Sequence, residues 1–368
     1  MSTKPTLCFL TGTLNAFAGA ERMTAVIANE LARRGYTVHI LSLWDAASCF
    51  ELEPAVRHDA LFAQRPSFRT RYLSTVLGIR RYLKRHRIEV LIEVDTMLTL
   101  FALPACLFLQ VQRVAWEHCD LTQDLGKPAR RLARRLAVRS CTRVVVLTER
   151  DRKRWHERLS PAAGRVIAIP NALPFPYPIE AAQRGTRTVL AVGRLTPAKG
   201  FDILLRAWAR IHGELPGWRL RIVGDGEERD TLLLLRERLG IAHCASLEPA
   251  RADVDGVYRE ASLFCLSSRY EGFGLVLIEA MSYGVPVLST ACETGPVALL
   301  RHNDNAWLVP PEDDRALAEA LRQLAMDDER MDRLAAAART SAARFAMPEV
   351  ASEWERLLAG LSRPAAAH

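Results

Sequence analysis

Short runs of apolar and β-branched residues alternate along this chain with longer stretches in which apolar positions recur every three or four residues. Such alternation is typical of βαβ units, whose parallel strands are buried beneath helices. In the first half the predicted strands are Thr6–Thr11, Thr37–Ser42, Val90–Val94, Arg113–Trp116, Arg143–Leu147 and Val166–Ile169. In the second half they are Thr188–Val192, Arg219–Val223, Ala245–Leu247, Leu263–Leu266, Pro286–Ser289 and Ala306–Val309. The pattern therefore predicts an α/β fold with parallel sheets.

The chain has 368 residues, more than one hydrophobic core usually holds, which favours two domains. Three prolines between residues 174 and 185 predict a linker there. We therefore predict two Rossmann-like, doubly wound domains, residues 1–173 and 186–346, that face a central crevice. Residues 347–368 have a helical pattern, and we expect that helix to pack back on the first domain. In such folds ligands bind where the carboxyl ends of the strands meet.

One largely apolar segment, Met97–Ala115, approaches the length of a membrane span, but Pro104 and several polar residues interrupt it. A buried helix followed by a buried strand is the better interpretation. We expect no signal peptide, because the first ten residues lack the charged and apolar regions of one. Eight cysteines without a C-x-x-C pair favour a reducing cytoplasm, and we expect neither a disulfide framework nor a metal site.

The net charge of +8 is unevenly distributed. Residues 1–175 carry 27 Lys and Arg against 15 Asp and Glu, a net +12, whereas residues 176–368 carry 23 against 27, a net −4. Two stretches concentrate the cations, Arg69–Arg87 and Lys127–Arg139, and the second has six cations and no acid. They predict basic amphipathic helices that meet an anionic membrane surface or a lipid diphosphate. The alternative is an arginine-rich face exposed only to solvent.

The most specific motif follows the predicted strand Leu263–Leu266, where a glycine-bearing loop leads into a helix at residues 267–281. Backbone N–H groups at the start of a helix can bind a phosphate. Glu271 and Glu279 lie eight residues apart, one in the loop and one on the helix, and a carboxylate beside a nucleotide commonly accepts from ribose hydroxyls. A tight turn and a solvated helix residue are the structural alternatives.

A second cluster follows the strand Thr188–Val192, where Gly193 ends the strand and Arg194 and Lys199 follow in a loop. Two cations at the edge of a sheet could neutralise a diphosphate, since Arg binds phosphate as a fork and Lys as a point charge.

These two motifs, in this order, resemble family 4 of the retaining GT-B glycosyltransferases, and the resemblance extends over nearly the whole chain. The segments 18–22, 169–171, 222–226 and 295–296 also resemble motifs of that family. Two residues depart from its pattern, because Ala18 and Ala306 stand where the family usually has glycine. Neither departure removes a charged group.

The resemblance implies roles for individual residues. The catalytic residues would be His118, Arg194, Lys199 and Glu271. The donor would be bound by Gly19, Gly193, Arg194, Lys199, Gly224, Glu271, Gly272, Phe273, Gly274, Leu275 and Glu279. For the acceptor we predict Glu21, Arg22, Asp95, Thr96, Arg130, Arg131, Arg134 and Arg135, with helix capping as the alternative for Asp95 and Thr96.

The expected activity is retaining transfer of a hexose or N-acetylhexosamine from a nucleotide sugar, a UDP-sugar before a GDP-sugar. No residue resembles a covalent nucleophile, so the leaving phosphate itself would take the acceptor proton. No Asp-x-Asp element lies in a suitable loop, and we expect a metal-independent reaction without a cofactor. The expected acceptor is a glycan linked to polyprenyl diphosphate in bacterial surface polysaccharide or oligosaccharide biosynthesis, at the cytoplasmic face of the inner membrane.

Two other functions stay open on the sequence alone. A GT-B enzyme can epimerise or hydrolyse nucleotide sugars without transferring them. A basic nucleic-acid-binding protein is a further alternative, although the arginine runs lack interleaved aromatic residues for base stacking.

Overall fold

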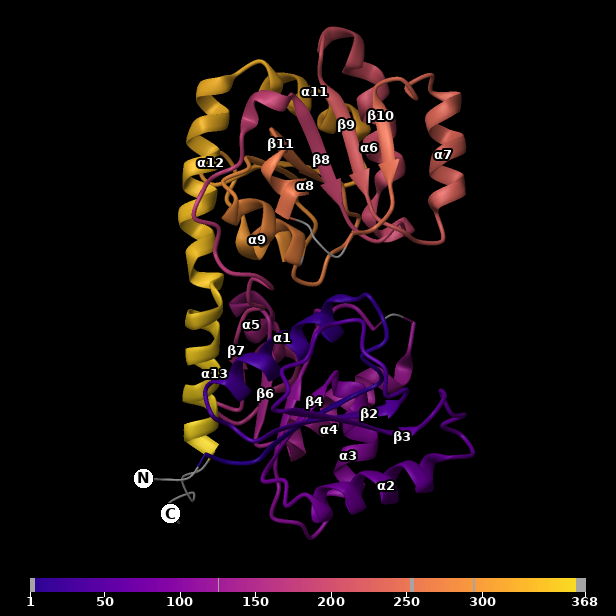
Figure 1. Ribbon diagram of the computed structural model, residues 1–368, viewed down its shortest axis with the longest axis vertical. Helices are drawn as coiled ribbons and strands as arrows, with labels where there is room; N and C mark the ends of the chain where they lie inside the picture. The colour runs from indigo at the N-terminus through magenta and orange to yellow at the C-terminus, as the bar shows by residue number, and fades with distance from the viewer. Residues whose placement is uncertain (1–3, 125, 252–254, 294, 362–368) are drawn as a thin grey trace. The chain divides into compact units, whose positions relative to one another are not determined.

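The computed structural model describes residues 4–124, 126–251, 255–293 and 295–361. The chain divides into two compact units, one of residues 1–175 with 347–368 and the other of residues 176–346. The division falls inside the segment expected to be a linker. Each unit is built around one parallel sheet (Figure 1).

The first unit contains a seven-stranded sheet in the order β3-β2-β1-β4-β5-β6-β7. Its strands are β1 (Leu7–Thr11), β2 (Val38–Trp44), β3 (Val56–Phe62), β4 (Val90–Val94), β5 (Gln112–Trp116), β6 (Arg143–Val146) and β7 (Val166–Ala168). Its helices are α1 (Gly19–Arg33), α2 (Tyr72–Arg85), η1 (Thr96–Leu98), α3 (Thr99–Ala105), α4 (Pro128–Ser140), α5 (Glu149–Leu159) and α13 (Met347–Leu361).

The second unit contains a six-stranded sheet in the order β10-β9-β8-β11-β12-β13. Its strands are β8 (Thr188–Val192), β9 (Arg219–Val223), β10 (Ala245–Glu248), β11 (Leu263–Leu266), β12 (Val287–Thr290) and β13 (Trp307–Val309). Its longer helices are α6 (Phe201–Ile211), α7 (Arg229–Arg238), α9 (Leu275–Ser282), α11 (Asp314–Ala325) and α12 (Asp328–Ala342). The short ones are η2 (Arg184–Thr186), η3 (Pro197–Lys199), η4 (His212–Glu214), α8 (Asp255–Arg259), α10 (Gly295–Leu299) and η5 (Ala343–Phe345).

All strand pairs in both sheets are parallel, which confirms the predicted fold class. The strands were predictable because they are buried on both faces and therefore read as continuous apolar runs. β3 was missed. It lies at the edge of its sheet, and Arg57, His58 and Asp59 interrupt its apolar pattern.

The carboxy-terminal helix α13 belongs to the first unit. Trp354 is fully buried, and its ring meets that of Trp116 edge to face with centroids 4.9 Å apart. Glu355 accepts from Arg34 at 2.8 Å and from Lys4 at 3.1 Å. A buried aromatic contact and ion pairs at the surface thus hold α13 against the rest of the first unit.

The apolar segment Met97–Ala115 forms η1, α3 and the start of β5, as the sequence indicates. No helix within the described ranges has both the length and the apolar character that crossing a bilayer requires.

Candidate active site

The two motifs of the second unit lie on neighbouring strands. β8 pairs directly with β11, so the loop 193–200 after β8 and the loop 267–274 after β11 leave the same edge of the sheet side by side. Ser267 donates its hydroxyl to the carbonyl of Lys199 at 2.9 Å, and the Arg269 amide donates to the carbonyl of Ala198 at 2.8 Å. The two loops therefore form one connected surface.

Lys199 and Glu271 are paired at the centre of this surface. The ammonium nitrogen of Lys199 lies 2.5 Å from Oε2 of Glu271, and the Ser268 hydroxyl donates to the same oxygen at 3.2 Å. Both charged side chains are mostly enclosed, with 20% and 12% of their surfaces exposed. In this geometry the glutamate holds the lysine beside the loop that precedes α9.

Arg194 is placed differently from Lys199. Its side chain is 66% exposed and lies 3.7 Å from that of Glu227, which is also exposed. An exposed pair of this kind contributes little to stability and is screened by salt. The guanidinium is therefore available to an anionic ligand at modest cost.

Two glycines allow these loops to pack closely. A Cβ on Gly224, the first residue after β9, would lie 1.9 Å from the carbonyl oxygen of Gly193. Gly200 has a φ of +63°, and a Cβ there would lie 2.2 Å from the carbonyl oxygen of Ser267. Neither backbone neighbour can move aside, so a side chain at either position would separate the loops.

The helix α9 begins within the second loop. Its N-cap Gly274 has a φ of +84°, which favours glycine, and the first N–H groups of the helix follow at Leu275. Gly272 is exposed, whereas the Phe273 side chain is buried against Phe345 with ring centroids 5.8 Å apart. Phe273 therefore presents only its backbone to a ligand.

Glu279 lies one turn into α9 and is almost fully buried. Its Oε2 accepts from the hydroxyl of Tyr258 at 2.8 Å, and the Tyr258 ring stacks on that of Tyr283 with centroids 5.5 Å apart. The carboxylate is thus held in one orientation. Its predicted contact with ribose hydroxyls stays a prediction.

The first unit gathers its predicted residues at the corresponding edge of its own sheet. β1, β4 and β5 are neighbours, and the loops after them lead to Gly19, Asp95 and His118 respectively. Gly19 is exposed at the start of α1, with Glu21 and Arg22 half-buried in the first turn. Burial raises the pKa of the Glu21 carboxyl, and the negative charge of Asp95 raises it further.

Asp95 has an unusual backbone conformation, with φ +94° and ψ 126°. A residue other than glycine in such a region costs roughly 1–3 kcal/mol and needs support from its surroundings. Here the carboxylate caps η1 by accepting from the Met97 amide at 2.8 Å, and it receives both arms of the Arg130 guanidinium at 2.9 and 2.7 Å. Helix capping, the alternative role, is thus observed for Asp95.

A buried network around Glu117 holds three of the residues predicted for the acceptor. The carboxylate of Glu117 accepts from Thr96 at 2.5 Å, from Arg130 at 3.1 Å and from Arg134 at 2.9 Å. Thr96 is fully buried, and Arg130 and Arg134 are only 3% and 2% exposed. The predictions that Thr96 touches acceptor hydroxyls and that Arg130 and Arg134 face a membrane were therefore wrong.

The physical reason lies in the helical spacing of α4. Arg130 and Arg134 are four residues apart and share the inner face of the helix with Ala133 and Ala137. Their acidic partners, Asp95 and Glu117, are the first residues after β4 and β5 and precede Arg130 by 35 and 13 residues. Arg131 and Arg135 do point outward, and Arg131 pairs with Asp124, so these two stay predictions for the acceptor.

His118 is the second residue after β5, and its ring centroid lies 4.4 Å from that of Trp116. Burial lowers the pKa of His118 to about 4, although the charge of Glu117 opposes that shift. The imidazole is therefore neutral near pH 7, where it can exchange hydrogen bonds with a sugar hydroxyl without adding a charge.

Comparisons with known proteins agree with this geometry. A model described as "Glycosyltransferase Family 4" matches residues 17–174. A model described as "Glycosyl transferases group 1" matches residues 178–341. This chain is a family 4 glycosyltransferase of the GT-B type.

Relatives that match this glycosyltransferase over nearly their whole length occur in bacteria. An uncharacterized glycosyltransferase of Haemophilus influenzae is 29% identical over 94% of this chain and 97% of its own length. A Campylobacter jejuni enzyme is 27% identical over 96% of this chain and 98% of its own. That enzyme is a GalNAc-α-(1→4)-GalNAc-α-(1→3)-diNAcBac-PP-undecaprenol α-1,4-N-acetyl-D-galactosaminyltransferase.

Among solved structures, Anabaena Alr3699/HepE in complex with UDP and glucose has a TM-score of 0.83 with this glycosyltransferase. The two are 22% identical, and the match covers 96% of this chain and 99% of that one. The likeness shows that the two proteins share the GT-B fold.

Two residues that position the motifs are not among those predicted from the sequence. Arg269 donates to both carboxylate oxygens of Asp202, at 2.9 and 3.0 Å, and to the carbonyl of Pro197 at 2.7 Å, so it joins the two donor loops. Tyr258 orients Glu279. Arg269 lies inside the motif and could have been singled out, whereas nothing local to Tyr258 signals its partner.

Proposed function

We propose that this glycosyltransferase transfers a hexose or N-acetylhexosamine from a UDP-sugar to a lipid-linked glycan, with retention of the anomeric configuration. The observation that carries the proposal is the enclosed Lys199–Glu271 pair beside the amino end of α9, with the exposed Arg194 on the adjoining loop. Cations and helix N–H groups aimed at a leaving diphosphate stabilise the charge that develops as the sugar departs. The name of the Campylobacter relative supports a polyprenyl-diphosphate acceptor.

Product analysis tests this activity against the two other reactions of nucleotide sugars. The enzyme is incubated with a UDP-sugar, with and without an undecaprenyl-diphosphate-linked glycan, and the products are resolved by NMR. We expect an acceptor-dependent product with the same anomeric configuration as the donor. A free sugar would indicate hydrolysis, an epimerised UDP-sugar would indicate epimerisation, and an inverted linkage would contradict the retaining mechanism.

We expect transfer to survive EDTA, because Arg194, Lys199 and the amino end of α9 together meet the charge of the diphosphate. The measurement is the initial rate of UDP release before and after dialysis against the chelator. A rate that stays within about twofold of the untreated enzyme agrees with the proposal. Loss of activity that magnesium or manganese restores would show that a metal ion assists the departure of UDP.

A surface that fits a membrane lies on α2 and the turn after α3. Four apolar side chains there are strongly exposed, and we call them the α2 patch: Leu73, Leu77, Leu107 and Phe108, at 72%, 48%, 54% and 92%. Arg80 ties the two segments together by donating to the carbonyl of Leu107 at 2.6 Å.

Cations surround the α2 patch. Between residues 60 and 88 the chain has no acid, and the exposed cations are Arg65, Arg69, Arg71, Arg81, Lys84, Arg85 and Arg87. Apolar side chains beside cations insert at the boundary of an anionic leaflet, where each cation contributes about 1 kcal/mol before screening. The α2 patch would therefore hold the first unit at the surface that carries the acceptor.

Changing Leu73, Leu77 and Phe108 together to serine should weaken binding to anionic vesicles by about tenfold or more, since the inserted apolar area is lost. Transfer to the lipid-linked acceptor should slow, while affinity for the UDP-sugar stays unchanged. The measurement is vesicle co-sedimentation alongside donor titration. Leu234→Ser is the matched control, because Leu234 is 60% exposed on α7. Equal sedimentation of the triple variant and the control would contradict membrane binding through the α2 patch.

A further inference from the structure

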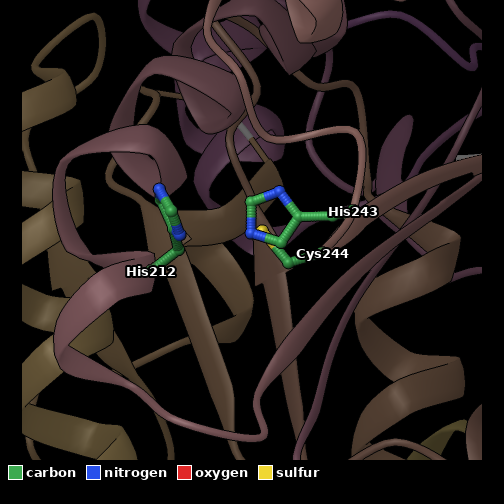
Figure 2. Close-up of side chains that lie close together, drawn as sticks. All are labelled: His212, His243 and Cys244. Carbon is green, nitrogen blue, oxygen red and sulfur yellow. The ribbon is translucent and has the colours of Figure 1, made fainter.

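Two histidines and a cysteine gather in the second unit, outside the donor loops. His212 is the first residue of η4, directly after α6, whereas His243 and Cys244 form the end of the turn that leads into β10. One ligand atom from each of the three residues lies within 4.8 Å of the other two. Figure 2 shows the sulfur of Cys244 partly behind the ring of His243, with the ring of His212 to the left of both.

The position of the cluster separates it from the donor site. Because all strands of this sheet are parallel, the donor loops leave the carboxyl ends of β8, β9 and β11. Cys244 precedes the first residue of β10 and therefore lies at the opposite, amino edge. β10 is also the terminal strand of the sheet, so the cluster joins an edge strand to the end of the helix α6.

The backbone of the cluster is held in place. The Leu220 amide of β9 donates to the carbonyl of Cys244 at 2.9 Å, and the Ala245 amide closes the turn by donating to the carbonyl of Ile241 at 2.9 Å. The thiol contacts that same carbonyl at 3.6 Å. The rings of His212 and His243 lie at 72° to each other with centroids 5.4 Å apart. Only side-chain rotation is needed to bring the three ligand atoms closer.

We propose that His212, His243 and Cys244 form a binding site for a divalent transition-metal ion with the ligand preference of zinc. Two imidazoles and a thiolate suit Zn²⁺ or Co²⁺ and do not suit Mg²⁺ or Ca²⁺, which prefer oxygen. Metal–ligand bonds of about 2.0–2.3 Å in a tetrahedral site place ligand atoms about 3.3–3.8 Å apart, so the side chains must close by about 1 Å from the present limit of 4.8 Å.

The surroundings suit an ion that enters from solvent. His243 is exposed, whereas His212 and Cys244 are half-buried, so one ligand can capture the ion and the other two can enclose it. Water would occupy the fourth position. The bound ion would fasten β10 to α6 and stabilise this edge of the sheet, because metal binding to the folded state adds to its stability. Spacing along the chain does not indicate this site, because 30 residues lie between the first histidine and the other two ligands.

The test is titration of the metal-free, full-length enzyme with Co²⁺ and with Zn²⁺. We expect one ion per chain and a sulfur-to-cobalt charge-transfer band, which reports directly on a thiolate ligand. His212→Ala, His243→Ala and Cys244→Ser should each weaken binding by more than the 10- to 100-fold that is typical of changes around a ligand. Zn²⁺ should raise the unfolding temperature of the wild type and leave that of Cys244→Ser unchanged, while Mg²⁺ and Ca²⁺ raise neither.

His86→Ala is the matched control, because the rings of His39 and His86 also form a pair, with centroids 4.9 Å apart. This control should bind as tightly as the wild type. Circular dichroism establishes that each variant is folded, and titration with UDP-sugar should give the same affinity for all of them, which separates this inference from the proposed function. Binding without a charge-transfer band, or binding weakened as much by His86→Ala as by Cys244→Ser, would show an adventitious ion only.

Discussion

Replacing Lys199 by alanine is expected to lower kcat/KM for transfer by about 100- to 1000-fold, the usual cost of removing one preorganised group that stabilises developing charge. The ammonium group lies 2.5 Å from Glu271 and is held beside the start of α9. The measurement is the initial rate of UDP release with a lipid-linked acceptor. Because the side chain is not part of the hydrophobic core, the unfolding temperature should change little.

Two further variants make this result specific. Lys199→Met keeps the length of the side chain and removes its charge, so it should lose as much activity as Lys199→Ala. Arg206→Ala removes an exposed cation of the same unit that pairs with Asp202 on α6, and it should keep nearly full activity. Near-normal turnover in a well-folded Lys199→Met variant would mean that this lysine does not meet the charge of the leaving group.

Replacing Arg134 by glutamine is expected to destabilise the first unit by about 3–5 kcal/mol, because the change breaks a buried ion pair and leaves one charge uncompensated. Its guanidinium donates to Glu117 at 2.9 Å and to the carbonyls of Leu121 and Asp120 at 2.8 and 3.0 Å. The loop that carries His118 lies within this network, so transfer should fall as well.

Hydrogen exchange followed by mass spectrometry shows which part of the chain is destabilised in Arg134→Gln. Peptides covering residues 113–155 should lose protection in Arg134→Gln, while peptides of the second unit keep theirs. Arg135→Gln is the matched control, since Arg135 is the next residue on α4 and points outward; exposed substitutions of this kind usually change stability by less than about 0.5 kcal/mol. The inward orientation of Arg134 would be refuted by equal protection in the two variants.

The fold could be predicted to a large extent because parallel strands covered on both faces carry an unmistakable apolar pattern. β4, β8, β9 and β11 begin and end as expected. The same dependence on burial explains why β3 was not predicted. An edge strand needs fewer apolar side chains, so its sequence resembles that of a loop. Local patterning therefore identifies the centre of a sheet better than its margin.

The sequence predicted some residues of the site correctly as neighbours of one sheet edge and misplaced others. Lys199 and Glu271 follow neighbouring strands, and the sequence motifs already placed them at one edge of a sheet. Arg130 and Arg134 were misinterpreted because four-residue spacing is shared by an exposed basic face and by a face buried against acids. Those acids are Asp95 and Glu117, which directly follow β4 and β5, and no local pattern reveals such a pairing.

Thermal unfolding across a panel of UDP- and GDP-sugars tests most directly whether the loops after β8 and β11 bind a UDP-sugar. A ligand that binds only the folded state raises the unfolding temperature by an amount that grows with the ratio of its concentration to its dissociation constant. We expect at least one UDP-sugar to raise the unfolding temperature of the wild type, and the double variant Arg194→Ala, Lys199→Ala to show no such rise. A shift produced only by GDP-sugars, or an equal shift in the double variant, would contradict UDP-sugar binding by these loops.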